Sequence, residues 1–299
     1  MTVMVEQLPE QPEPAAKPRR LQRMLPFLII FVGILVVLYP VVGTIVQNMQ
    51  QQQTAKNYTN RILDEFTAEQ RQASIAAAHR WNDENAGGPI LDPWLARIDS
   101  SNIEYQDYLQ QLNLDEVMAR IIIPSIDSDL PVYHGTDEET LEKGVGHLFG
   151  SSLPVGGESS HAVLTGHTGL SHATLWDNLV DVDTGDAFYI NVAGETLKYE
   201  VHSIEVVAPN DSERLGIVEG EDLVTLITCT PYGVNSHRLL VTGHRVDIDP
   251  AEGVQILEQK RVPWQWWMTA AIAMIVIALG LLTLLWGRIK QQREAEEGS

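Results

Sequence analysis

The sequence predicts a mainly β domain between two membrane-spanning helices, and three observations lead to this fold class. Two long apolar runs, residues 24–46 and 264–286, contain no charged residue. Between them lie many short segments rich in β-branched residues and separated by Pro and Gly, a pattern typical of a small closed barrel or a sandwich. The chain has 40 Asp and Glu against 20 Lys and Arg, which argues against a nucleic-acid-binding protein.

Both apolar runs are long enough to cross a membrane, since a helix needs about 20 apolar residues to span the hydrocarbon core. Pro40 lies near the end of the first run and is expected to kink or end that helix. The first run is also too long for the apolar part of a cleaved signal peptide, about 7–15 residues. Basic residues before the first run and after the second place both termini in the cytoplasm, against the opposing signal of Lys260 and Arg261.

The elements between the runs follow from composition and periodicity. Residues 47–80 are rich in Gln and Ala and predict an exposed helical stalk, residues 82–95 a loop, and part of 102–119 a short helix. The later segments predict, in chain order, two strands in 118–133 broken by Pro124 and Pro131, a short helix at 137–143, a strand at 161–167, a hairpin at 187–207 that turns at Ala193 and Gly194, and strands at 223–229 and 238–246.

The single cysteine, Cys229, ends one apolar strand, and Arg238 begins the next. If these strands are neighbours, the two side chains face each other across the mouth of the sheet. A nearby cation favours the reactive thiolate, and a guanidinium can also hold the oxyanion of an acyl-transfer reaction. The alternative is a buried cysteine that acts only as a small apolar side chain.

A cysteine nucleophile usually works with a histidine that serves as acid and base. Of the nine histidines, His167 is the best placed, because it ends an apolar strand in LTGHTGL between two glycines. Most of the others are expected on the surface or in the core. His237 and His244 flank the strand of Arg238 and are the rivals, although His237 should point to the opposite face of that strand.

Together these motifs resemble those of sortases. TLITCTPYG followed by HR is similar to the TLxTC…R signature of that family, and LTGHTGL is similar to its histidine motif. The longer stretches TCTPYGVNSHRLLVTGHR and GVGHLFGSSLPVGGESSHAVLTGH, with a second membrane helix, resemble class C sortases, the pilin polymerases of Gram-positive bacteria. The resemblance implies a closed sortase-type β-barrel with short helices, in which His167, Cys229 and Arg238 are catalytic.

Class C sortases also resemble one another in a lid that carries a DPW or DPF tripeptide, which Asp92, Pro93 and Trp94 match. In the family the acidic residue meets the catalytic arginine, and the aromatic ring covers the cysteine pocket. Without the resemblance, Asp-Pro is a turn signal. Two positions depart from the family pattern: Thr168 stands where many relatives carry arginine, and Phe149 where an acidic residue is common, which bears on substrate preference.

The function implied is that of a membrane-anchored cysteine transpeptidase. It would cleave an LPXTG-like sorting signal through a thioacyl-enzyme and pass it to a lysine of another pilin, so the partners are pilin subunits and the lipid membrane, without nucleic acid. No cofactor is implied, and the sequence lacks zinc or calcium ligand spacing. Alternatives are a sortase that uses a peptidoglycan amine, a cysteine hydrolase, and a non-catalytic scaffold in which Cys229 is structural.

The expected division of the chain has a catalytic barrel at its centre and a membrane helix on either side. Its parts are a cytoplasmic tail at 1–23, a transmembrane helix at 24–46, a helical stalk and lid loop at 47–105, the sortase barrel at 106–250, a linker at 251–263, a transmembrane helix at 264–286 and a cytoplasmic tail at 287–299. The barrel is expected on the extracellular face.

Overall fold

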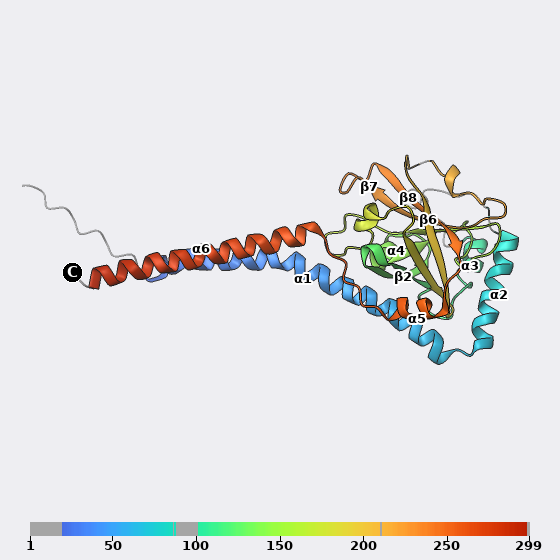
Figure 1. The fold of residues 1–299 in the computed structure, drawn as a ribbon, viewed down its shortest axis with the longest axis horizontal. Coiled ribbons are helices and arrows are strands. Elements are labelled where there is room, and N and C mark those ends of the chain that lie inside the picture. Colours follow the sequence, from blue (N-terminus) through green and yellow to red (C-terminus); the bar gives the residue numbers. More distant parts are fainter. Residues whose placement is uncertain (1–19, 86, 88–100, 210, 298–299) are drawn as a thin grey trace, which may run out of the picture. The chain divides into compact units, whose positions relative to one another are not determined.

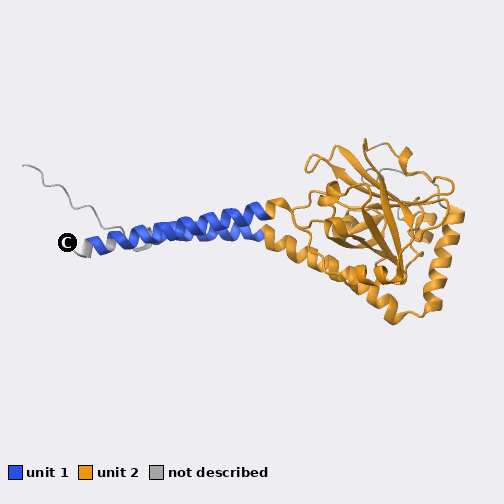
Figure 2. Cartoon of the chain, in the orientation of Figure 1, with its two compact units in different colours: residues 1–39, 269–299 blue, residues 40–268 orange. Residues whose placement is uncertain are grey.

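The computed structural model describes residues 20–85, 87, 101–209 and 211–297. It divides into two compact units: Met1–Tyr39 with Thr269–Ser299, and Pro40–Met268 (Figure 2). The second unit contains every strand of the barrel. The proposed lid tripeptide, residues 92–94, lies outside the described residues.

Two helices have the length and apolar composition needed to cross a membrane. They are α1 (Arg20–Glu65) and α6 (Trp266–Glu297). Within the first unit, the ring of Phe27 lies edge-on to that of Trp286, with centroids 5.9 Å apart. The prediction that Pro40 could end the first helix is wrong, because α1 continues through it. Spanning helices tolerate proline where neighbouring groups satisfy the freed carbonyl.

Eight strands close into a barrel in the order β1-β2-β3-β4-β7-β8-β6-β5 (Figure 1). Closure removes the exposed strand edges that an open sheet presents, and it resolves the choice between barrel and sandwich. Most neighbours are antiparallel, but β2 with β3 and β4 with β7 are parallel. The strands are β1 (Ala119–Ile123), β2 (Ser128–His134), β3 (Val145–His147), β4 (Ser160–Thr165), β5 (Ala187–Val192), β6 (Glu195–Val207), β7 (Asp222–Thr230) and β8 (His237–Val246).

Turn chemistry accounts for several strand boundaries. Ala193 and Gly194, both with positive φ (44° and 85°), join β5 to β6, as a two-residue hairpin turn requires. Pro131 lies inside β2, opposite Arg120, so the prediction that it breaks a strand is wrong. Asp137 accepts a hydrogen bond from the amide of Thr140 at 3.0 Å and caps α4 (Glu138–Lys143). The remaining short helix before the barrel is α3 (Ile103–Tyr108).

The predicted stalk is helical, but it is not exposed along its length. Ala55, Tyr58 and Ile62 recur at helical spacing on one face of α1 and are buried. The hydroxyl of Tyr58 donates to the carbonyl of Met118 and accepts from the amide of Ala193, each at 2.9 Å. This part of α1 therefore packs along the barrel. It turns at Phe66 and Thr67 into α2 (Ala68–Asn85).

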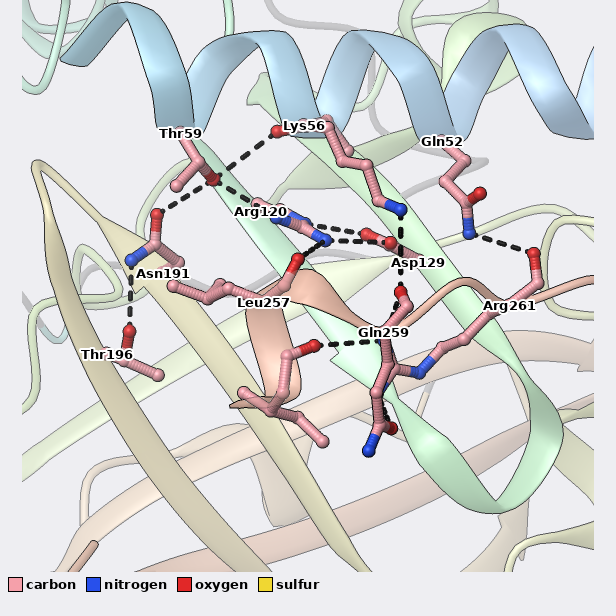
Figure 3. Close-up of polar contacts among 12 residues, drawn as sticks. Gln52, Lys56, Thr59, Arg120, Asp129, Asn191, Thr196, Leu257, Gln259 and Arg261 are labelled. Carbon is pink, nitrogen blue, oxygen red and sulfur yellow. Dashed lines mark hydrogen bonds and ion pairs between the residues drawn. The ribbon is translucent and has the colours of Figure 1, made fainter. Parts of the chain in front are cut away.

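A buried ion pair between β1 and β2 connects two helices to the barrel wall (Figure 3). Arg120 of β1 donates to both carboxylate oxygens of Asp129 in β2, at 2.7 and 2.8 Å, and each side chain is 1% exposed. The same guanidinium donates to Thr59 of α1 at 3.3 Å and to the carbonyl of Leu257 in α5 (Pro250–Glu258) at 3.0 Å. The pair satisfies its hydrogen-bonding groups by joining α1 and α5 to the barrel wall.

A second buried polar network lies between α3 and β3. Tyr108 contacts His147 Nδ1 at 2.9 Å, and His147 Nε2 lies 2.8 Å from the carbonyl of Ser152. Because a carbonyl only accepts, Nε2 carries the proton of a neutral imidazole. Burial lowers the pKa of His147 to about 4. Phe149 packs against Tyr105 and Tyr108, with centroids 5.2 Å apart in each pair.

Candidate active site

Cys229 and Arg238 are paired directly across β7 and β8. Residues opposite each other in an antiparallel pair point to the same face of the sheet. Both are largely buried, with 6% and 7% of their surface exposed. The structure therefore brings these two predicted site residues together at one end of the barrel.

The turn between β7 and β8 supports the arginine. The carbonyl of Pro231 accepts from the amides of Val234 and Asn235, at 3.0 and 2.9 Å. Arg238 Nη1 in turn donates to the carbonyls of Asn235 and His237, each at 3.3 Å. The turn thus holds the guanidinium against its own backbone, close to the end of the strand that carries the cysteine.

His167 follows directly on the strand that runs parallel to β7. At the end of β4, the amide of Gly166 donates to the carbonyl of Ile227 at 3.0 Å, and Thr228 Oγ1 donates to the carbonyl of Gly166 at 2.8 Å. The strands pair Thr165 with Ile227, and this register, continued by two residues, sets His167 beside Cys229. All three predicted residues therefore lie at the same end of the barrel, on three neighbouring strands or their extensions.

The segment after His167 is folded over a buried tryptophan. The amide of Trp176 donates to the carbonyl of His167 at 3.2 Å, and Thr168 Oγ1 donates to the carbonyl of Trp176 at 3.1 Å. A Cβ atom at Gly166 would lie 2.6 Å from the ring of Trp176, which is 0% exposed. Only glycine allows this close approach. The buried Thr168 therefore acts in holding the loop.

The environment of His167 favours its neutral form. Burial lowers the pKa of His167, while the carboxylates of Glu142 and Glu138 on α4 act in the opposite direction. At neutral pH most of the imidazole is therefore uncharged.

The rival histidines lie elsewhere. His237 is exposed and pairs with Thr230, and its Nδ1 lies 2.9 Å from Ser236 Oγ. It neighbours Arg238 in sequence but points to the other face of β8. His244 pairs with Leu223 at the far end of the strand. Of the three candidates, the strand register therefore favours His167.

A shallow hollow adjoins this group on the outer face of β7 and β8. Ile227, two residues before Cys229 and on the same face, contributes to it. Most of its wall is apolar, while Arg238 supplies a cation. Its lining residues are Val207, Pro209, Asp211, Ser212, Leu215, Ile227, Arg238 and Leu240. Arg238 therefore lies at a largely apolar depression, on the face of the sheet to which Cys229 also points.

No local pattern in the sequence indicates which residues support the histidine loop. Asp177 accepts from the amide of Gly169 at 2.6 Å and from Gln265, and burial raises its pKa. Asn48 is hydrogen-bonded to Thr174 across 126 positions of sequence. Contacts this distant leave no trace in local periodicity. Among the described residues, no group of three or more His, Cys, Asp or Glu could hold a metal ion.

Comparison with known proteins identifies the family. A Sortase domain family model matches residues 121–246. Sortase A of Bacillus anthracis is 32% identical over 155 residues, which cover 50% of this chain and 71% of that protein. The chain belongs to the sortase family. The match to a second curated sortase covers 61% of that protein's length.

Solved sortase structures agree with the barrel. The crystal structure of sortase C-1 from Actinomyces oris is 58% identical, with a TM-score of 0.58, and the match covers 60% of this sortase and 99% of that chain. A lid mutant of sortase A from Corynebacterium diphtheriae is 51% identical, with a TM-score of 0.58 and coverages of 62% and 98%. The fold prediction, a mainly β sortase barrel with apolar helices toward both ends of the chain, is confirmed.

Proposed function

We propose that this sortase is a membrane-anchored class C transpeptidase that joins pilin subunits, with Cys229, His167 and Arg238 as its catalytic residues. The observation that carries the proposal is the cross-strand pair of Cys229 and Arg238, set beside the loop of His167. A thiol, a cation and an imidazole at one end of a barrel are the groups that acyl transfer requires. The high identity to sortase C-1 of Actinomyces oris supports the subclass.

The first half of the reaction forms a thioester. The Cys229 thiolate attacks the carbonyl of threonine in an LPXTG-like sorting signal, and Arg238 donates hydrogen bonds to the oxyanion. The imidazolium of His167 gives its proton to the glycine amine as the Thr–Gly bond breaks. Burial lowers the pKa of His167, which disfavours the imidazolium member of the thiolate–imidazolium pair at neutral pH.

The second half resolves the thioester. The amine of an acceptor lysine attacks the thioester carbonyl and loses a proton to His167, and the thiolate of Cys229 leaves as the new amide forms. The product is an isopeptide bond between two pilin subunits. The hollow beside Arg238 suits the apolar part of the sorting signal, because its lining is mostly apolar. Membrane attachment of enzyme and substrates raises their effective concentration.

The same proposal assigns Asp92, Pro93 and Trp94 to a lid over Cys229. Support comes from the family resemblance of the tripeptide and from the solved lid mutant of sortase A from Corynebacterium diphtheriae. The double variant Asp92→Ala/Trp94→Ala should react with a maleimide probe faster than wild type, with Cys229→Ala as the blank. An unchanged labelling rate would remove the lid from the account.

The site is proposed to act outside the cell, with both termini in the cytoplasm. The basic residues before the first apolar run and after the second support this orientation. In a Cys229→Ala background, Ser299→Cys should resist a membrane-impermeant maleimide in intact cells, while Ser171→Cys, at an exposed position next to the site, should react. The reverse pattern would contradict the orientation.

The acceptor decides between pilin polymerisation and cell-wall anchoring. The full chain in detergent micelles should be given an LPXTG-type peptide with three acceptors in competition: a lysine-bearing pilin fragment, a peptidoglycan-type amine and water. The proposal predicts mainly the lysine-linked peptide by mass spectrometry. Transfer mainly to the peptidoglycan amine would reassign the enzyme to anchoring, and release of free peptide with both amines present would make it a hydrolase.

A further inference from the structure

The loop that follows His167 is hydrogen-bonded to both of the chain segments that lead from the barrel toward the apolar helices. Residues 166–177 begin at the end of β4 and finish at the first residue of a short 3-10 helix, η2 (Asp177–Asp181). Three of the last residues of this loop, Thr174, Trp176 and Asp177, are buried. The loop has no strand of its own, so these contacts determine where its backbone lies.

The first set of contacts involves the C-terminal segment. Asp177 lies at the centre of it: one carboxylate oxygen accepts from the amide of Gly169 at 2.6 Å, two residues after His167. The other oxygen accepts from the side-chain amide of Gln265, one residue before α6 begins. Gln265 in turn accepts from the indole of Trp267, which orients its amide so that the nitrogen faces Asp177.

The second set of contacts involves α1. The side chain of Asn48 donates to Thr174 Oγ1 at 2.8 Å and accepts from the amide of Thr174 at 3.0 Å. A paired contact of this kind fixes both position and orientation. A small hollow lined by residues that include Asn48, Leu175 and Pro263 shows that α1, the loop and the C-terminal linker meet here.

We propose that Asp177 and Asn48 are positioning residues that hold the loop of His167 in register with Cys229, and that Gln265 completes this support from the entrance of α6. This inference rests on the proposed function of His167. None of the three residues reaches the reacting atoms, and each acts through the loop backbone. The imidazole is thus held from the two chain segments that lead to the apolar helices, so a fragment that ends before Gln265 lacks part of its own active-site support.

The physical reason is the sensitivity of proton transfer to distance. A displacement of about 1 Å can reduce a rate by about 100-fold. Without these two sets of contacts the loop still has its link to β7 at Gly166 and its bonds to Trp176. The rate of acyl transfer should therefore fall while the thiol and Arg238, which lie on β7 and β8, stay in place.

A swapped hydrogen bond tests the proposal in the full chain. In Asp177→Asn the hydrogen bond is lost, because two amide nitrogens, both donors, face each other. In Gln265→Glu it is lost because two carboxylates, both acceptors, face each other. The double variant restores a donor and an acceptor with their roles exchanged. Each single change should lower kcat for acylation by LPXTG-type peptide about 10- to 100-fold with little change in KM, and the double variant should return most of the rate.

Matched controls separate positioning from folding. Asp181→Asn changes an exposed carboxylate in the same 3-10 helix, and Asn57→Ala changes an amide on α1 that pairs only locally with Gln53. Both should leave kcat unchanged, whereas Asn48→Ala should lower it. At a pH high enough to ionise the thiol without help from His167, alkylation of Cys229 by iodoacetamide should proceed at the wild-type rate in every variant, since the thiol keeps its strand.

Hydrogen–deuterium exchange gives a readout that does not depend on activity. Amides in residues 166–177 should exchange faster in either single variant and return to wild-type protection in the double variant. If the wild type forms no acyl-enzyme, the proposed function fails, and exchange alone then decides the positioning role. Unchanged kcat and exchange in the single variants, or a double variant as impaired as the singles, would overturn the inference. Should Asp177→Asn not fold, Gln265→Glu and Asn48→Ala carry the same comparison.

Discussion

Cys229 and Arg238 face each other across β7 and β8, one residue inside the end of each strand. In this position the guanidinium lies on the same face as the thiol, where an oxyanion forms when the thiolate attacks a carbonyl. Arg238→Ala should therefore lower acyl-enzyme formation about 100- to 1,000-fold, the usual effect of removing an oxyanion donor. The acylation rate of Arg238→Lys should lie between those of wild type and Arg238→Ala, because lysine keeps the positive charge but loses the planar set of guanidinium donors.

His237 supplies the control for this prediction. It is adjacent to Arg238 but exposed and directed to the other face. His237→Ala should keep the acylation rate within about twofold of wild type, as surface substitutions usually do. The measurement is the rate of thioester appearance by intact mass. Equal loss in His237→Ala and Arg238→Ala would contradict the assignment of roles.

Gly166 should not accept a side chain. A Cβ there would lie 2.6 Å from the buried ring of Trp176, and overpacking of this kind costs about 1–3 kcal/mol. Gly166→Ala should lower the free energy of unfolding by that amount and displace His167. Gly253→Ala in α5, where the nearest atom is 3.5 Å away, should instead leave stability unchanged or raise it slightly. Thermal unfolding of the two variants in detergent makes the comparison, and equal stability would disprove the packing argument.

The buried pair of Arg120 and Asp129 should behave differently from a surface pair. Asp129→Ala leaves a buried guanidinium without its carboxylate and should cost about 3–5 kcal/mol of unfolding free energy. The double variant Arg120→Met/Asp129→Leu should recover most of this loss, because an apolar pair of similar volume fills the site.

The surface control for this pair is Lys143→Ala, which breaks an exposed pair with Glu139 and should leave the melting temperature almost unchanged. If Asp129→Ala unfolds at the same temperature as Lys143→Ala, the pair does not fasten α1 and α5 to the barrel.

His147 should make the barrel sensitive to acid. Its folded pKa is about 4, against 6.5 when unfolded, so the unfolded chain takes up a proton first as the pH falls. The neutral His147 contributes its full stabilisation of the fold above pH 6.5. This contribution, about 3 kcal/mol of unfolding free energy, is lost as the pH drops toward 4. His147→Gln keeps a donor for Ser152 and should flatten the decline of melting temperature over this range. An equally steep decline in the variant would place the acid sensitivity elsewhere.

The barrel strands and the pairing of the Cys229 and Arg238 strands can be predicted from sequence because they depend on local patterns. β-branched runs, the Ala193-Gly194 turn and the Pro-Gly turn after Cys229 each mark a strand end within a few residues. The register between β7 and β8 follows from that short turn. The position of His167 was suggested by its place at the end of an apolar strand.

The features that the sequence did not predict depend on packing between residues far apart in the chain. The stalk was expected to be exposed, but Ala55, Tyr58 and Ile62 turn one stripe of it toward the barrel. Pro131 was expected to break a strand and is accommodated within β2. The contacts of Asn48 and Gln265 with the histidine loop join positions 126 and 88 residues apart. No local pattern specifies such pairs, because they form only when the barrel closes.

The central claim is that Cys229 carries an acyl group during turnover. The most direct measurement is the intact mass of the full chain after brief incubation with an LPXTG-type peptide and no amine, followed by peptide mapping. The account predicts an adduct of the peptide without its glycine, bound to Cys229, absent in Cys229→Ala and removed by hydroxylamine. No adduct on the wild type, even with Asp92 and Trp94 replaced by alanine, would contradict the account.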